Sequence, residues 1–380
     1  MSRRRTAVLA LLLLFSASCS GGPPQPAART IEIGVDLPLS GPQAPDSQAA
    51  LIQLSLVLDG IYHGRVEGLP VTLRVLSESS GDARDPLQGR RNVLRLAAEP
   101  AVLAVVGPLD SDVAEAEIPV ATAAHLALVS PSASNACLTR PLADCDGLSA
   151  RLRGAGPTSF FRVVPGDDGE AAAAVEFATG RLRATRFAVG SDGQAYGTTL
   201  RDRFTAALKQ RRLTPVYSGD VDPANDVSVD AFLAAAKAAG ADAVMFGGRG
   251  DGGTCRLAAK IPAALGSDVP LLGGAGLVGA ACEKDAGAGS SSVYAAQESQ
   301  GTEARDAVRS ILRAIAAAIK SEGGNRPSRE QVRLAISRGS SPAFDSRGDP
   351  RVRRYYIVRG PAPGPDLAPA RWVEAGTVSL

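Results

Sequence analysis

Short apolar runs alternate with longer stretches of helical periodicity along most of this 380-residue chain. The pattern predicts strands at Thr30–Leu39, Val71–Leu76, Val102–Val106 and Leu126–Val129, with helices between them at Ser47–Ile61, Pro86–Ala98 and Asp112–Ala124. A strand that returns to its sheet through a helix runs parallel to its predecessor, and the crossover is right-handed. The first half of the chain is therefore predicted to be an α/β layer with a doubly wound parallel sheet.

The same alternation begins again after a cysteine-containing loop. Strands are predicted at Phe187–Val189, Pro215–Tyr217, Ala243–Phe246 and Pro270–Leu272, and helices at Glu170–Gly180, Thr198–Lys209, Val229–Ala239 and Thr254–Ala264. Two series of similar size predict two similar lobes, as expected of a chain too long for one hydrophobic core. Two helices (Glu303–Lys320 and Ser328–Ile336) and a strand (Tyr355–Val358) follow, and the proline-rich tail beyond Gly360 is predicted to be irregular.

The N-terminus has the features of a bacterial secretory signal that ends in a lipobox. Arg3–Arg5 precede the apolar run Ala7–Phe15, and the small residues Ser16–Ser18 precede Cys19. We expect residues 1–18 to be removed, Cys19 to be lipidated, and residues 19–29 to form a Gly/Pro-rich linker. An ordinary signal peptide with an incidental cysteine remains an alternative, because lipoboxes usually carry Leu where Ser16 stands. A transmembrane anchor is disfavoured, because the run is about half of the ~20 residues that a span needs.

Charge and hydropathy exclude two classes of function. The net charge is +2 with 21% charged residues, which provides no electrostatic surface for nucleic acid. The predicted mature chain has no apolar stretch of membrane-spanning length. We therefore expect an exported body that is tethered to a membrane and does not cross it.

Four cysteines remain after Cys19, and an oxidising compartment favours disulfides between them. The spacing favours the pairs Cys137–Cys145 and Cys255–Cys282, although four cysteines allow three pairings. A zinc site is disfavoured, because the chain has no C-x-x-C and its two histidines stand apart from every cysteine. No metal site is predicted.

Three polar loops follow predicted strands of the first lobe, where ligands of open parallel sheets bind. They are Ser40–Pro42, Gly107–Ser111 and Ser130–Asn135. Ser111 opens a predicted helix, where a hydroxyl and free backbone N–H groups favour a carboxylate or similar anion. Ser132 and Ser134 would add two hydroxyls from the neighbouring strand end. The alternative is that Ser111 is only a helix cap and the serine loop only a turn.

Enzyme signatures are mostly absent from the sequence. It has no G-x-S-x-G, no G-x-x-x-x-G-K-[ST] and no H-E-x-x-H. Gly274–Gly279 matches the G-x-G-x-x-G of dinucleotide-binding proteins, and Glu298 lies about 20 residues further on. That motif needs a helix after the glycines, and residues 280–290 are too rich in Gly and Ser for a full one. We predict no catalytic residue and no cofactor.

Several short motifs occur together in a fixed order. They are Ile33–Pro42, Val105–Gly107 with Ser111, Val129–Asn135, Phe160–Val163, Gln194–Gly197 and Phe344–Asp349. With the lipobox and the two lobes, they resemble the substrate-binding lipoproteins of ABC importers of the branched-chain amino acid, urea and amide type. The resemblance implies three crossovers near residues 163, 296 and 350. Lobe 1 would then be residues 30–163 and 296–350, and lobe 2 residues 164–295 and 351–380.

The resemblance also implies a ligand site between the lobes. Ser111, Ser132 and Ser134 correspond to the residues that hold the ligand's α-carboxylate in that family, and Tyr196 corresponds to a pocket tyrosine. The acid that pairs with the ligand's ammonium is replaced by Ala275.

Two pocket aromatics are also replaced, by Arg249 and by Asp46. Asp46 could supply the missing negative charge, whereas Arg249 would suit a ligand with a second acid group.

The function expected from these observations is that of an exported solute-binding lipoprotein. It would be anchored to the outer face of the cell membrane or lie in the periplasm. It would capture a small polar amino acid, carboxylate or amide as a monomer and deliver it to the permease of an ABC transporter. The alternative is a degenerate or sensory relative that does not deliver ligand for transport, and an enzyme is not expected.

Overall fold

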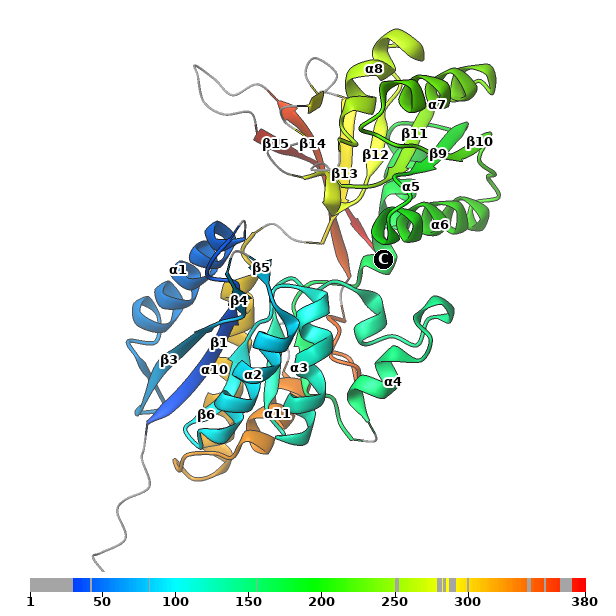
Figure 1. Cartoon of the computed structure of the whole chain (residues 1–380). Helices are drawn as coiled ribbons and strands as arrows, with labels where there is room; N and C mark the ends of the chain where they lie inside the picture. Colours follow the sequence, from blue (N-terminus) through cyan, green and yellow to red (C-terminus); the bar gives the residue numbers. More distant parts are fainter. Residues whose placement is uncertain are drawn as a thin grey trace, which may run out of the picture.

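Two β-sheets with helices on both faces form the two lobes of the computed structural model (Figure 1). The structure describes residues 30–380 except residues 42, 82, 155, 250–252, 279–281, 283–284, 287–291, 299–300, 340–342, 352 and 363–370. The predicted α/β fold with two lobes and parallel sheets is confirmed.

The sheet of lobe 1 has six strands in the order β2-β3-β1-β6-β7-β8. They are β1 (Ile31–Leu37), β2 (Arg65–Val66), β3 (Leu69–Ser77), β6 (Val102–Val106), β7 (Ala127–Ser130) and β8 (Phe160–Arg162). All neighbours are parallel except β2 and β3. Every residue of β6 and β7 is buried, as expected of parallel strands covered on both faces.

Helices cover both faces of this sheet. One face carries α1 (Ala44–Gly60), α10 (Glu303–Ser321) and α11 (Arg329–Arg338), and the other carries α2 (Pro86–Ala98), α3 (Ser111–Ala123) and α4 (Leu148–Arg153). The hairpin β4 (Ser79–Ser80) and β5 (Ala83–Arg84) follows β3. Val308, Ile311, Leu312 and Ile315 of α10 are buried at helical spacing, which explains why this helix packs on the sheet.

The sheet of lobe 2 has seven strands in the order β10-β9-β11-β12-β13-β14-β15. They are β9 (Phe187–Ser191), β10 (Tyr217–Asp220), β11 (Ala243–Gly247), β12 (Leu271–Gly273), β13 (Val293–Gln297), β14 (Arg354–Ala362) and β15 (Arg371–Ser379). Helices α5 (Glu170–Gly180) and α6 (Ala195–Gln210) cover one face. Helices α7 (Asp226–Ala238) and α8 (Arg256–Ala264) cover the other.

The prediction of an irregular tail beyond Gly360 is wrong. β14 continues to Ala362, and β15 pairs with it antiparallel. Trp372 packs on one face of the sheet and Val378 on the other, so burial of apolar side chains stabilises a strand here. The proline-rich composition belongs to residues 361–369 and does not extend into β15.

The chain crosses between the lobes three times. It leaves lobe 1 after β8, returns after β13 to form α10 and α11, and re-enters lobe 2 at β14. These three connections join the lobes, and residues from loops of both lobes line the space between them. Among the described residues, no helix is long and apolar enough to cross a membrane.

Candidate functional site

A cleft of about 740 Å³ lies between the two lobes. Its walls come from residues that follow the carboxyl ends of parallel strands, as in other open α/β sheets. Lobe 1 contributes Ser111 at the start of α3 and Ser134 after β7. Lobe 2 contributes Tyr196 of α6 and the turn Ala275–Leu277 after β12.

The lobe 1 wall joins the start of α3 to the serine loop. The Ser111 Oγ accepts a hydrogen bond from the backbone N–H of Asn135 at 3.1 Å. The buried Ser130 hydroxyl donates to the Pro108 carbonyl at 2.7 Å and accepts from the Ala133 N–H at 2.9 Å. These bonds fix the loop against α3. The Ser111 hydroxyl acts as an acceptor in this contact, so its own proton remains available to donate into the cleft.

The lobe 2 wall contains a carboxyl group that the sequence did not indicate as a site residue. Glu170, the first residue of α5, is 1% exposed and borders the cleft. Its Oε1 accepts from the Ala275 N–H at 2.9 Å, and its Oε2 accepts from the Tyr196 hydroxyl at 3.3 Å. An ionisable carboxyl group from a different element of the fold therefore contacts the backbone of Ala275.

A second buried carboxyl group, Glu298, is hydrogen-bonded to Glu170. Burial and the nearby Asp167 raise the pKa of Glu170 to about 7, and burial beside Glu170 raises the pKa of Glu298 well above its ordinary value. A hydrogen bond between two carboxyl groups requires one proton, and Glu298 is the group that keeps it. Glu170 is then the member of the pair that can carry charge near neutral pH.

Glycines bring the Ala275–Leu277 turn close to Tyr196. A Cβ on Gly274 would lie 2.7 Å from the Tyr196 hydroxyl, and one on Gly276 would lie 2.7 Å from its Cε1. The first two glycines of the G-x-G-x-x-G match therefore permit close packing on a tyrosine. The segment described directly after β12 is a short 3-10 turn, Ala275–Leu277.

The cleft is strongly charged, and the arginines are paired with acids. On lobe 1, the Arg84 Nε lies 3.1 Å from Asp112 and 3.6 Å from Asp110. Burial raises the pKa of Asp110, and the charges of Arg84 and of the exposed Arg249 oppose that rise. Arg249, on lobe 2, thus acts electrostatically on lobe 1 across the cleft.

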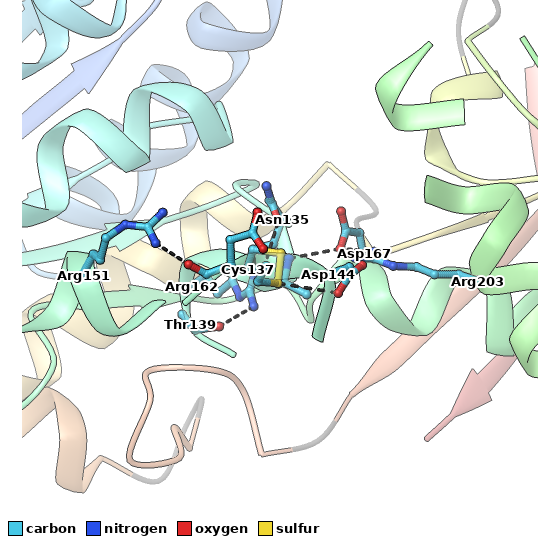
Figure 2. Close-up of a disulfide and its surroundings, with 11 residues drawn as sticks. Asn135, Cys137, Thr139, Asp144, Arg151, Arg162, Asp167 and Arg203 are labelled. Carbon is cyan, nitrogen blue, oxygen red and sulfur yellow. Dashed lines mark hydrogen bonds and ion pairs between the residues drawn. A yellow bond between two sulfur atoms is a disulfide. The ribbon is translucent and has the colours of Figure 1, made fainter. Parts of the chain in front are cut away.

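The loop closed by Cys137 and Cys145 provides a further contact between the lobes (Figure 2). Asp144 of this loop lies 3.5 Å from the Arg203 Nη2 on α6. The Arg203 Nη1 also binds the Asp167 carboxylate at 2.6 Å, and Asp167 accepts from the Ala136 N–H at 3.0 Å. Cys137 itself borders the cleft.

Four of the six predicted ligand-binding residues line the cleft: Ser111, Ser134, Tyr196 and Arg249. Ser132 does not, because its exposed hydroxyl donates to the Leu109 carbonyl at 2.8 Å. Asp46 does not either, since it is exposed in the first turn of α1. The acidic group that the sequence analysis expected at Asp46 is provided by Glu170 instead. Glu170 is the first residue of α5, and in the sequence it is not distinguishable from the acids that commonly begin helices.

The structure joins Cys137 to Cys145 and Cys255 to Cys282, with Cα–Cα distances of 5.2 and 5.1 Å. The sulfurs of the first pair also lie near the Asp144 carboxylate. Because these two sulfurs bond to each other, that group is not a metal site. Cys19 and the predicted signal lie outside the described residues.

Comparisons with known proteins agree with this architecture. A curated relative, the Leu/Ile/Val-binding protein homolog 3 of Brucella melitensis, is 28% identical over 249 residues, which are 65% of this chain. The match spans 61% of that relative's length.

Solved structures share the fold at low identity. A leucine-binding protein from Thermotoga maritima aligns with a TM-score of 0.65 and 18% identity, over 92% of this chain and 98% of the other. A solute-binding protein from R. palustris, in complex with benzoate, aligns with a TM-score of 0.62 and 18% identity, over 92% and 96%.

The family model described as periplasmic binding protein matches residues 30–337, which include both walls of the cleft and most of the two sheets. This chain belongs to the periplasmic binding protein family.

Proposed function

We propose that this protein captures a small polar solute with a carboxylate or amide group in the interlobe cleft and presents it to an ABC permease. The observation that carries the proposal is a cleft between two lobes with a helix start and hydroxyl groups on one wall. The facing wall carries a tyrosine and a buried acid. Ligand contacts with both walls would stabilise the closed arrangement of the lobes, which is the usual response of such hinged proteins.

The carboxylate or amide end of the ligand binds at the start of α3. The N-terminus of this 13-residue helix carries partial positive charge, and its first backbone N–H groups have no partner within the helix. The Ser111 hydroxyl adds a donor, and the Ser134 hydroxyl lies beside it in the cleft wall. These groups suit an anionic or amide oxygen.

A ligand ammonium group, where one is present, faces Glu170. An ammonium group buried without a counter-charge would cost several kcal/mol, so Ala275 alone would disfavour amino acids. Glu170 lies at hydrogen-bonding distance from the Ala275 backbone and carries the charge that residue 275 lacks. The name of the Brucella relative, a Leu/Ile/Val-binding protein homologue, supports an amino-acid ligand.

Arg249 supports a second group of ligands, solutes with an additional acid and no ammonium. It lines the cleft and acts on Asp110 opposite, so it can bind a carboxylate that enters between the lobes. The benzoate complex of the R. palustris protein supports non-amino carboxylates as ligands of this fold.

Thermal unfolding against a ligand panel tests the proposal. The panel contains leucine-like amino acids, dicarboxylates, benzoate, amides and urea. A true ligand at about 100 times its Kd stabilises the fold by about 2.7 kcal/mol, which raises the unfolding midpoint measurably. If no member of the panel shifts the midpoint, the alternative of a sensory or degenerate relative without a transported ligand is favoured.

Glu170→Gln separates the two ligand groups. We expect it to weaken binding of an amino acid by about tenfold or more, and to leave the matching acid without an ammonium group unaffected. Glu115→Gln is the matched control, because Glu115 is exposed at the cleft wall and should change affinity less than about threefold. Equal losses for both ligands would contradict the assignment of Glu170 to the ammonium.

We also propose that the protein is extracytoplasmic, monomeric and held to the membrane by a lipidated Cys19. The basic, apolar and small-residue segments before Cys19 support this localisation, and more than one acyl chain gives stable anchoring. Cys19→Ala should release the protein from the membrane or leave it unprocessed. Unchanged processing and membrane retention would contradict lipidation at this cysteine.

The proposed lobe boundaries remain residues 30–163 and 296–350 for lobe 1, and 164–295 and 351–380 for lobe 2. The three crossings between the sheets support this division. If the lobes close about these crossings, backbone hydrogen exchange near residues 163, 296 and 350 should change when ligand binds.

A further inference from the structure

Three acidic side chains without exposed surface meet inside lobe 1, away from the cleft. Asp36 lies near the end of β1, Glu78 directly after β3, and Glu117 in the middle of α3, and each is 0% exposed. One carboxylate oxygen of each lies within 4.8 Å of the others. Burying an unpaired charge is costly, so each of these carboxyl groups either keeps a proton or needs a compensating cation.

Two of these carboxyl groups form a pair that the surrounding structure orients. Asn92 of α2 donates to the Asp36 Oδ1 at 2.7 Å and to the Ser77 carbonyl at 2.7 Å, which leaves the Asp36 Oδ2 facing Glu117. Gly89 makes room for this partner, since a Cβ there would lie 2.8 Å from the Glu117 Oε1. The packing thus holds Glu117 against the Asp36 carboxyl group, and no other group among the described residues donates to it.

Glu78 is an independent observation that points to a ligand. Neither of its carboxylate oxygens has a hydrogen-bond partner within the described part of the chain, and the side chain is directed at the Asp36 and Glu117 pair. The nearby Arg84 makes its ion pairs with Asp110 and Asp112, at 3.6 and 3.1 Å, and makes none with Glu78 among the described contacts.

The three carboxylate oxygens lie close enough together to share one cation. For three points within 4.8 Å of one another, some position lies within about 2.8 Å of all three, since 4.8 Å divided by √3 is about 2.8 Å. Ca²⁺ binds oxygen at about 2.3–2.6 Å, and a site with only carboxylate oxygens favours hard divalent cations over zinc or copper.

We propose that Asp36, Glu78 and Glu117 bind one hard divalent cation, with Ca²⁺ as the first to test, inside lobe 1. The ion would replace the protons that burial favours on these carboxyl groups and would compensate their charges once they are ionised. It would also tie β1, the segment after β3 and α3 together. The inference is independent of the ligand in the cleft.

The test counts bound cations on the protein from residue 20 onward, which contains the whole described fold. After treatment with EDTA and dialysis against Ca²⁺, atomic emission should find about one ion per chain. Saturating Ca²⁺ should raise the thermal midpoint by about 4 °C or more. No bound Ca²⁺, Mg²⁺ or Mn²⁺ at about 1 mM would overturn the proposal, whatever the outcome in the cleft.

Glu78→Gln distinguishes this site from exposed acids. It should lower Ca²⁺ affinity by about tenfold or more, because it replaces one of the three carboxylate ligands by a neutral amide. Asp59→Asn, an exposed acid of α1, is the control and should bind Ca²⁺ as the wild type does. Unchanged Ca²⁺ binding in Glu78→Gln would assign the ion to surface carboxylates and overturn the proposal. If this variant misfolds, Glu117→Gln provides the same comparison.

Discussion

Removing the buried guanidinium of Arg162 should destabilise the protein strongly. Arg162 is 0% exposed, and its Nε lies 2.8 Å from the Asp349 Oδ1. The same group donates to the Ala133 and Asn135 carbonyls at 3.2 and 2.8 Å and to the Thr139 Oγ1 at 2.7 Å. It therefore joins the end of β8 to the serine loop and to the segment that leads back into lobe 2.

The size of the stability loss follows from the groups that lose their partner in Arg162→Met. Asp349 would remain as a nearly buried carboxylate without its cation, and two carbonyl groups would lose a donor. Breaking a buried ion pair from one side costs about 3–5 kcal/mol. At about 2–4 °C per kcal/mol for lobes of this size, the thermal midpoint should fall by about 6–20 °C.

Two further variants test the reasoning behind this number. Arg151→Met is the matched control, because Arg151 is exposed on α4 and should matter by about 0.5 kcal/mol or less. Arg162→Met/Asp349→Asn should recover at least about half of the loss, since it removes the stranded charge. Circular dichroism during heating measures all three. A midpoint for Arg162→Met within about 2 °C of the control would refute the reasoning.

Three more predictions concern other parts of the fold. Cys255→Ser/Cys282→Ser should lower the free energy of unfolding by about 3.5 kcal/mol, from the closure entropy of a 27-residue separation, and an unchanged urea midpoint would contradict this. Glu170 holds its proton more tightly in the folded state, where its pKa is about 7, than in the unfolded chain, where it is near 4.5. Its contribution to stability is therefore complete below about pH 4.5 and lost as the pH rises to about 7, so Glu170→Gln should flatten the pH profile of the thermal midpoint over this range. Gly276→Ala should cost about 1–3 kcal/mol, because its Cβ would lie 2.9 Å from a backbone carbonyl oxygen, whereas Gly156→Ala meets nothing within 4 Å and should be near neutral.

The sequence was sufficient to predict the α/β architecture, because the strand and helix periods are clear in both halves. β6 matches its prediction at Val102–Val106, and α2 matches at Pro86–Ala98. β10 begins two residues later than expected, at Tyr217, because Pro215 belongs to the preceding connection. Element ends depend on tertiary contacts that a periodic pattern does not contain.

Short strands at the lobe crossings were not predicted. β8 has three residues, which are too few for its period to distinguish a strand from a buried loop. β13 directly follows residues 286–292, whose Gly- and Ser-rich composition indicates a loop. β15 was missed because the proline bias of the preceding segment was extended over it. Its Arg371–Ser379 run pairs only with β14, at the edge of the sheet.

The candidate site was partly predictable, because loop position indicated Ser111 and Ser134, and the family resemblance indicated Tyr196 and Arg249. Glu170 was not, since its role depends on the turn at Ala275, which is 105 residues away in the chain. The same holds for the proposed cation site, whose acids come from positions 36, 78 and 117 and share no sequence motif. Side chains that meet only through the tertiary fold carry no local signal.

The most direct test of the central claim is a calorimetric titration of the best ligand from the thermal panel. It compares the wild type with Ser111→Ala and Ser132→Ala, which remove one hydroxyl inside and one outside the cleft. Binding between the lobes predicts that Ser111→Ala weakens affinity by about tenfold, near 1.4 kcal/mol, while Ser132→Ala stays within about twofold of the wild type. Equal affinities for all three proteins would contradict a ligand held at the start of α3.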